Sequence, residues 1–224
     1  MKSTKLNLTA AALAVSVAMG AGFASQEAQA EVTASLGASN MYLWRGQNLT
    51  PDGGQIHGGL NFASKVGVYG GIWASSEEGG HETDLYVGYG GEAGKFTYDV
   101  SYWKYWYPEE GTNQDLGNTD NSELVLSGTY GPVTATAYIN VESDTNDDDY
   151  FTVAGSFEDF TLTYGWWDTE LASGNDYSHI TLGYSFNDEL SFAVSVADND
   201  VPDASGVETD PLFQVAWAKS FDLK

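Results

Sequence analysis

The chain has no cysteine and few cations, and both shortages limit what it can do. None of its 224 residues is Cys, which excludes disulfides and thiolate metal sites. Lys and Arg number 8 against 32 Asp and Glu, so the formal net charge is −24. Binding to a nucleic-acid backbone requires clustered cations, whereas those after residue 30 are scattered: Arg45, Lys65, Lys95, Lys104, Lys219 and Lys224. Nucleic acid is therefore not an expected partner.

Long hydrophobic runs are also missing, apart from one at the N-terminus that has the layout of a secretory signal peptide. Lys2 and Lys5 precede an apolar stretch from Ala10 to about Met19, and Ala28-Gln29-Ala30 has the small-x-small form of a cleavage site. The alternative, an N-terminal anchor, is disfavoured because a spanning helix needs about 20 apolar residues. We expect residues 1–30 to be cleaved after Ala30 and residues 31–224 to form one exported domain.

Helical periodicity is absent from residues 31–224, and a two-residue alternation takes its place. Apolar Leu190, Phe192, Val194 and Val196, for example, alternate with small or polar residues. Twelve such segments occur, and most have lengths near the ~9–11 residues of a tilted membrane strand: 31–46, 55–63, 66–75, 83–90, 95–107, 121–130, 133–142, 149–157, 160–168, 176–186, 189–198 and 210–222. The pattern predicts an all-β fold, a single transmembrane antiparallel up-and-down barrel of about twelve strands, with ten to fourteen compatible.

The connections between these segments alternate between short and long. The short ones are 64–65, 91–94, 131–132, 158–159 and 187–188, and the long ones are 47–54, 76–82, 108–120, 143–148, 169–175 and 199–209. Short periplasmic turns and long external loops are typical of outer-membrane barrels. An even number of strands returns both ends of the barrel to the periplasmic rim.

Six of the seven tryptophans lie at or towards segment ends that run into long connections. They are Trp44, Trp73, Trp103, Trp106, Trp166 and Trp167. Indole rings favour the headgroup depth of a membrane, so we expect an aromatic girdle at the external rim. The alternative is ordinary core packing in a β-sandwich, which would spread aromatic residues along the strands.

Five stretches in the first half of the chain share a pattern with a known family. They are Ser39-Asn40-Met41-Tyr42-Leu43-Trp44-Arg45-Gly46, Thr50-Pro51, Gly58-Gly59, Gly67 to Ser75 and Glu82 to Tyr89. In these stretches the chain resembles the TorF-type porin family of proteobacteria. The likeness is specific over residues 32–107 and architectural beyond them. It implies an outer-membrane channel and supplies no binding residues. This chain departs from the common aromatic C-terminus of such barrels, since it ends Phe221-Asp222-Leu223-Lys224.

Polar residues on the inward parity are the candidates for lining a channel. They are Arg45, Asp84, Asp99, Glu123, His57 and His179. Arg45 is the only arginine, and it either pairs with Asp99, Glu123 or Asp84 in the lumen, or contacts lipopolysaccharide phosphate from the rim. The excess of carboxylates predicts a preference for cations.

No motif indicates an enzyme, a metal site or a cofactor. The histidines lack zinc-binding spacing, and no GxSxG elbow occurs. Asp144 and Asp147-Asp148-Asp149 lack the order of a calcium loop and are interpreted as a solvated acidic loop. We therefore expect a channel for small solutes, with membrane lipid and lipopolysaccharide as its surroundings. A soluble periplasmic β-sandwich or lipocalin-like binder, and a plugged barrel or adhesin, remain as alternatives, and the oligomeric state stays open.

Overall fold

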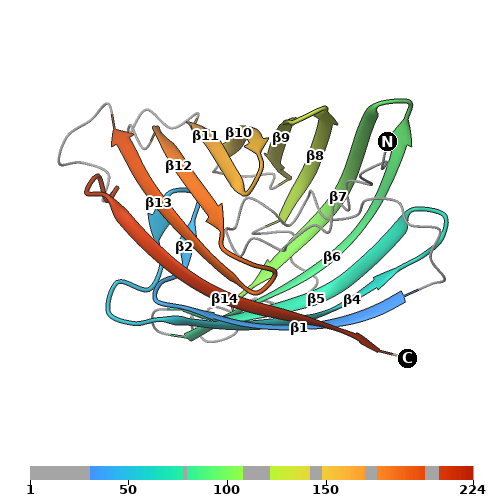
Figure 1. The fold of residues 1–224 in the computed structure, drawn as a ribbon, viewed down its shortest axis with the longest axis horizontal. Helices are drawn as coiled ribbons and strands as arrows, with labels where there is room; N and C mark the ends of the chain where they lie inside the picture. Colours follow the sequence, from blue (N-terminus) through green and yellow to red (C-terminus); the bar gives the residue numbers. More distant parts are fainter. Residues whose placement is uncertain are drawn as a thin grey trace, which may run out of the picture.

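Twelve long strands pair into one closed antiparallel barrel, shown in Figure 1. The computed structural model describes residues 31–77, 80–107, 122–141, 148–169, 176–199 and 207–223. The barrel strands are β1 (Glu31–Ser39), β4 (Gln55–Ala63), β5 (Val68–Glu77), β6 (Gly80–Ala93), β7 (Phe96–Trp106), β8 (Ser122–Tyr130), β9 (Val133–Asn140), β10 (Asp148–Phe157), β11 (Phe160–Thr169), β12 (Tyr177–Ser185), β13 (Leu190–Asn199) and β14 (Leu212–Leu223). Chain neighbours lie side by side, and β1 closes the ring by pairing with both β4 and β14. The predicted fold class is confirmed.

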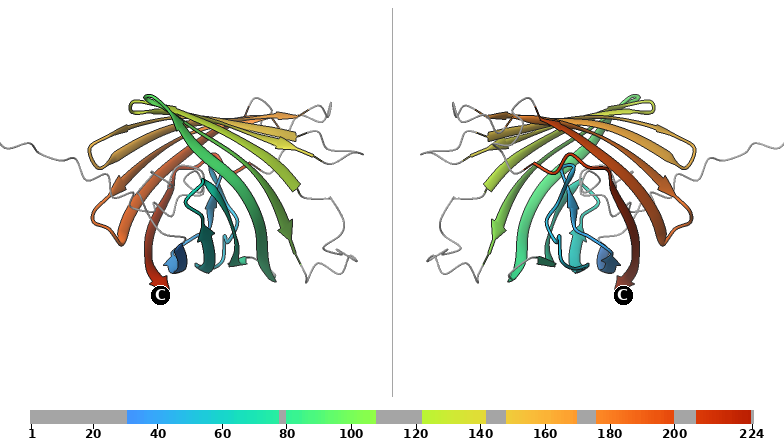
Figure 2. Two further views of the ribbon diagram at one scale, coloured as in Figure 1. Left: turned by 90° about the vertical axis from the view of Figure 1, so that its right-hand side faces the viewer. Right: turned by 90° about the vertical axis from the view of Figure 1, so that its left-hand side faces the viewer.

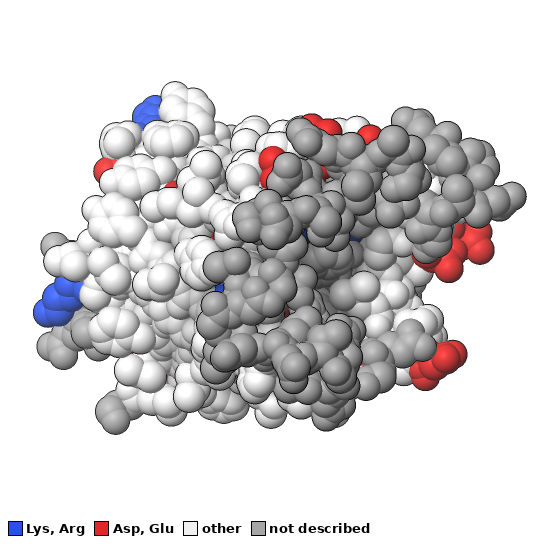
Figure 3. Space-filling view, turned by 180° about the vertical axis from the view of Figure 1, so that it is seen from behind, with Lys and Arg blue, Asp and Glu red and all other residues white. Residues whose placement is uncertain are grey.

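The two faces of each strand differ as the alternation predicts. On β13, Val194 and Val196 are 40% and 44% exposed, whereas Ser195 between them is fully buried. On β13 the outward side chains are thus apolar and the inward ones small or polar, and on other strands large aromatic rings such as Trp103 and Tyr150 also face inward. Figure 3 shows one side of the molecule, where the visible described wall is mostly uncharged and the Lys, Asp and Glu side chains lie largely toward its edges. Among the described residues, no helix is long and apolar enough to span a membrane.

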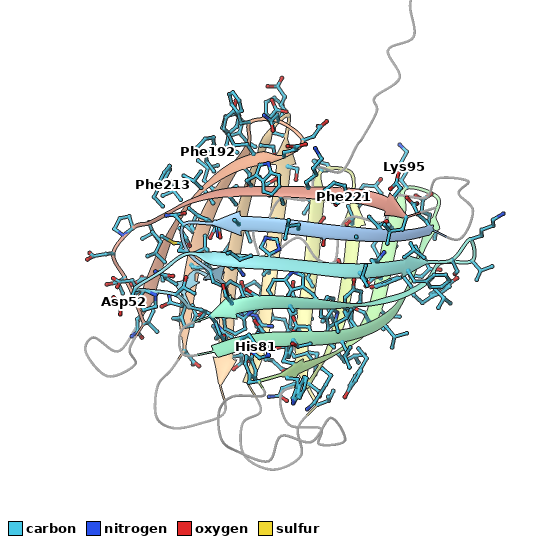
Figure 4. All side chains as sticks on the ribbon, turned by 90° about the horizontal axis from the view of Figure 1, so that it is seen from below. Asp52, His81, Lys95, Phe192, Phe213 and Phe221 are labelled. Atoms are coloured by element: carbon cyan, nitrogen blue, oxygen red, sulfur yellow. The ribbon has the colours of Figure 1, made fainter. Side chains whose placement is uncertain are left out.

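The tight turns gather at one rim of the barrel. Gly94 and Gly131 have positive φ angles of 71° and 61°, which glycine adopts without steric cost. The start of β1 and the end of β14 lie at the same rim, since Val32 pairs with Leu223. In Figure 4, Lys95 marks this end, and Asp52 and His81 lie toward the other. The predicted long connection at 76–82 is wrong, because the strands continue until Glu77 pairs with Gly80.

The first predicted segment, 31–46, ends early, at Ser39. The Asn40 side chain replaces the next ladder bonds to β14, donating to the Phe213 carbonyl at 2.9 Å and accepting from the Val215 amide at 2.7 Å. Residues 41–50 then turn to the inner side of the wall and form a small hairpin, β2 (Leu43–Trp44) with β3 (Gln47–Asn48). Figure 2 shows this blue hairpin within the ring of strands. Of the connection expected at 47–54 as an external loop, residues 47–50 therefore lie inside the barrel, whereas residues 51–54 are exposed.

Candidate functional site

Arg45, at the tip of the inner hairpin, reaches the far wall of the barrel. The hairpin starts between β1 and β4, and β9 and β10 are each five strands away around the ring. Arg45 contacts Glu123 on β8, Tyr138 on β9, Tyr150 on β10 and Trp167 on β11. These strands centre on the point opposite the hairpin's origin, so the hairpin crosses the whole lumen.

The guanidinium group of Arg45 is enclosed by one carboxylate and four aromatic rings. Its Nη2 donates to both oxygens of Glu123 at 2.7 and 2.6 Å. Its central carbon lies 4.4 Å from the ring of Trp44, 4.8 Å from Tyr138, 4.6 Å from Tyr150 and 4.7 Å from Trp167, all within cation–π range. We call Glu123, Tyr138, Tyr150 and Trp167 the guanidinium box.

The electrostatics of the box keep Arg45 charged. Burial is the largest single influence and lowers the pKa of Arg45, but the charge of Glu123, the hydrogen bonds to it, and the contributions of Tyr105 and Tyr138 together outweigh burial, so the pKa lies above its ordinary value. Tyr105 also donates to Glu123, at 2.7 Å. The carboxylate is thus held from two sides, and the charges form a fixed pair inside the barrel.

Hydrogen bonds tie the rest of the hairpin to the wall. Tyr177 on β12 donates to the Arg45 carbonyl at 2.9 Å, and Gln214 on β14 donates to the Met41 carbonyl at 3.0 Å. The Tyr42 hydroxyl donates to Glu82 on β6 at 2.8 Å. These bonds reach widely separated parts of the ring, so the hairpin is anchored around the lumen and not only at its tip.

Carboxylates outnumber cations beside the hairpin. Glu82, Asp84 and Glu123 are 2%, 3% and 8% exposed. Glu82 accepts from Tyr42 and Tyr107, and Glu123 is paired with Arg45. Within the described residues, Asp84 Oδ1 is buried without a hydrogen-bond partner. This part of the lumen therefore has a surplus of buried acidic groups.

Asp99 lies nearer the short-turn rim, as the fourth residue of β7. It accepts the Tyr69 hydroxyl on both oxygens at 2.8 Å and pairs in register with Ser127. The sequence left Asp99, Glu123 and Asp84 open as partners of Arg45, and the structure places Glu123 there.

The two inward histidines occupy separate places. His57 lies against Trp73, with ring centroids 5.7 Å apart. His179 is 1% exposed, and its nitrogens face the Tyr150 hydroxyl at 2.6 Å and the Thr181 hydroxyl at 3.0 Å. The Thr181 hydroxyl in turn lies 2.8 Å from that of Ser195. His179 is thus part of a buried hydroxyl network that backs the guanidinium box.

The tryptophans expected at the external rim divide between the two sides of the wall. Trp103 is 6% exposed and stacks on inward Tyr86, with centroids 4.3 Å apart. Trp73 and Trp167 also point inward, and Trp44 is on the hairpin. Trp106 and Trp166 are on the outward parity, where Trp166 stacks on Phe151. Most of these rings therefore build the lumen site.

An outward aromatic belt lies at the opposite rim, and the sequence interpretation missed it. Large aromatic residues flank the short turns and are 43–74% exposed: Phe62, Phe96, Tyr130, Phe157, Phe160 and Phe186. Such a belt suits the headgroup depth of a bilayer. The signal in the sequence was an aromatic residue within two positions of each short turn, on the apolar parity.

Several expectations concern residues outside the described ranges. They are the signal peptide at 1–30, most of the long connections expected at 108–120, 143–148, 169–175 and 199–209, and the acidic residues Asp144 and Asp147. The side chain of Asp148 also lies outside the described part.

The comparisons with known proteins agree on the architecture. A family model described as a bacterial protein of unknown function (Gcw_chp) matches residues 23–210. No curated protein sequence matches the chain. The chain is similar to the KdgM porin, with 9% identity, a TM-score of 0.50, and 86% of this chain and 99% of that chain covered. It is similar to a structure described under "Unveiling the Mechanism Behind the in-meso Crystallization of Membrane Proteins", with 12% identity, a TM-score of 0.55, and 85% and 84% covered.

A more distant likeness is to the outer membrane phospholipase A from Escherichia coli, at 8% identity and a TM-score of 0.42, covering 88% of this chain and 90% of that chain. At 9% identity, the likeness to the KdgM porin shows the fold alone, which is that of outer-membrane barrels. The description of the matching family does not mention TorF-type porins, so that finer resemblance stays a hypothesis.

Proposed function

Because the chain belongs to the Gcw_chp family of bacterial proteins of unknown function, its activity has to be inferred from the barrel itself, and we propose that it is an outer-membrane channel for small solutes. The observation that carries the proposal is a closed ring with an apolar outside, a polar inside and a charged hairpin across its bore. Eight strands leave an interior that side chains fill, and sixteen leave a wide pore. A twelve-strand ring narrowed by a hairpin would pass only small solutes.

Cation preference follows from the lumen charges. The inward carboxylates Glu82, Asp84, Asp99 and Glu123 face a single arginine, Arg45. Glu123 and Arg45 offset one another, which leaves the other three to attract cations. Exposed acids on the long-loop side, such as Asp52, would add a weaker attraction that salt screens within about 10 Å at 0.1 M.

The surroundings that we propose are bilayer lipid and lipopolysaccharide. The exposed apolar wall and the aromatic belt at the short-turn rim support contact with lipid. Export would use the signal peptide at residues 1–30, with cleavage after Ala30. The short turns would then face the periplasm, because barrels of this kind keep their longer connections outside.

A plugged structural barrel is the second candidate, and the hairpin itself favours it. A segment that crosses the bore and is bonded on several sides would block passage if it never moved. The current through planar bilayers separates the two candidates. A channel gives discrete conductance steps, whereas a permanently plugged barrel inserts without any.

Reversal potential across a tenfold KCl gradient tests the cation preference. We expect wild-type protein to favour K⁺, and Asp99→Asn to lower that preference because Asp99 faces the lumen. Asp52→Asn is the matched control, since Asp52 is exposed on the long-loop side, and it should have a smaller effect. Preference for Cl⁻ in the wild type would refute the proposal. Equal effects of the two variants would show that Asp99 in the bore does not determine the selectivity.

A further inference from the structure

The guanidinium group of Arg45 lies in a site whose carboxylate and aromatic rings suit the binding of guanidinium ions in general, although here the bound group belongs to the chain itself. We propose that the guanidinium box binds solutes that carry a guanidinium group, and that such a solute displaces Arg45 and releases the hairpin from the far wall. The displacement step rests on the proposed channel function. The binding step rests on the box alone.

The box belongs to the barrel wall and not to the hairpin. Glu123, Tyr138, Tyr150 and Trp167 come from four consecutive strands, β8 to β11. Glu123 is also held by Tyr105, and Tyr150 by His179. Withdrawal of the hairpin would remove Arg45 and Trp44 and leave the carboxylate and three rings in place. The site is therefore pre-organised for a cation from solution.

The resident group is imperfectly bound. Only Nη2 of Arg45 reaches Glu123, and within the described residues Nη1 is buried without an acceptor. The usual fork of two parallel N–H···O bonds between guanidinium and carboxylate is not formed. A guanidinium group free of the backbone can turn to present two nitrogens to Glu123. It would replace the two contacts that Arg45 makes through a single nitrogen with the two parallel bonds of the fork.

The backbone beneath Arg45 is strained as well. Its φ angle is 48°, and Gly46 follows at 84°. Two central residues with positive φ make the type I′ geometry of a two-residue hairpin, in which Asn-Gly is preferred. A long side chain in the left-handed region costs free energy that its contacts must offset. Contacts with the box account for an arginine at this position, and losing them would release the strain.

The charge of the lumen favours cations as the ligand. Glu82 and Asp84 lie on the hairpin side of β6, and Tyr42 of the hairpin bonds Glu82. Asp84 Oδ1 is a buried acceptor with no partner among the described residues. An ammonium group lacks the flat face that stacks between rings and the fork that fits a carboxylate, so guanidinium is the preferred class.

Calorimetric titration of the detergent-solubilised full chain tests the binding step. The probes are methylguanidinium, methylammonium and the neutral isostere urea. In Arg45→Ala the box is vacant, and methylguanidinium should bind at least about tenfold more tightly than methylammonium, because an ammonium group can form neither the parallel fork with Glu123 nor a stacked contact with the rings. Urea should not bind. Adding Glu123→Gln to Arg45→Ala should weaken methylguanidinium binding by about tenfold or more.

Titrations of the Gln47→Ala variant and of the wild type complete the test. Gln47→Ala alters the same hairpin without touching the box, and it should bind methylguanidinium as weakly as the wild type. The wild type should itself show saturable binding, weaker than Arg45→Ala because Arg45 competes, so the proposal stays testable if Arg45→Ala does not fold. Equal affinity for the two cations, or binding that survives Glu123→Gln, would overturn the proposal.

Bilayer current separates this proposal from the channel function. Methylguanidinium should raise the K⁺ conductance of the wild type, while urea should leave it unchanged and Arg45→Ala should start from the higher value. Binding in detergent with no current in any variant would refute the channel and leave the box supported. Current without selective binding of methylguanidinium would support the channel function and refute the proposed guanidinium site.

Discussion

Leu126→Arg is expected to destabilise the barrel strongly, because Leu126 faces lipid at mid-strand. It is the fifth of the nine residues of β8 and is 43% exposed. Its register partners are Val100 on β7 and Ala137 on β9. Neither neighbour offers a carboxylate, so an arginine here would remain an unpaired charge in the apolar wall.

The expected cost is about 2–4 kcal/mol, the range for arginine at the midplane of a membrane barrel. The matched control is Ser127→Arg, one residue further along on the inward parity. Ser127 pairs in register with Asp99, so the new guanidinium would find a carboxylate in a wet lumen. We expect Ser127→Arg to change stability by less than about 1 kcal/mol and to reduce the preference for cations.

Urea unfolding from phospholipid vesicles measures both variants. Urea is the denaturant of choice because guanidinium would compete for the box around Glu123. If Leu126→Arg is as stable as the wild type, or if both variants lose the same stability, the assignment of the inner and outer faces is wrong.

Two other predictions concern topology and packing. An epitope inserted after Asp210, in a long connection, should be labelled on intact cells, and one after Asn187, in a short turn, should not. The reverse pattern would show that the barrel has the opposite orientation in the membrane. Gly165→Ala should destabilise the barrel by about 1–3 kcal/mol, because a Cβ there would overlap the ring of His179. Gly155→Ala is its control, since nothing lies within 4 Å of the added Cβ, and equal urea stability of the two variants would contradict the packing argument.

The architecture could be predicted because it depends on local patterns. A strand that separates lipid from a polar lumen must alternate its side chains, and Val194, Ser195 and Val196 show this in the sequence alone. Strand ends were less certain. The segment expected to run to residue 46 stops at Ser39, because the Asn40 side chain takes the hydrogen bonds that the next β1 residue would have made.

The aromatic residues show where sequence patterns are insufficient. Parity tells which rings share a face but not whether a nearby segment covers that face. Trp167 was expected at the rim, yet it lies beside Arg45 because the hairpin folds against it. The exposed aromatic residues at the short turns, such as Phe157 and Phe186, were visible in the sequence and were overlooked.

By itself the sequence determined the strand number, the alternation of faces and the surplus of negative charge, since each follows from residue type and spacing along one strand. Only the tertiary structure decided that residues 41–50 fold inward and that Arg45 meets Glu123, which is 78 residues away in the chain. Closing the ring brings β8 to β11 opposite the start of the hairpin. A pairing across the diameter of a barrel depends on that closure, and no local periodicity encodes it.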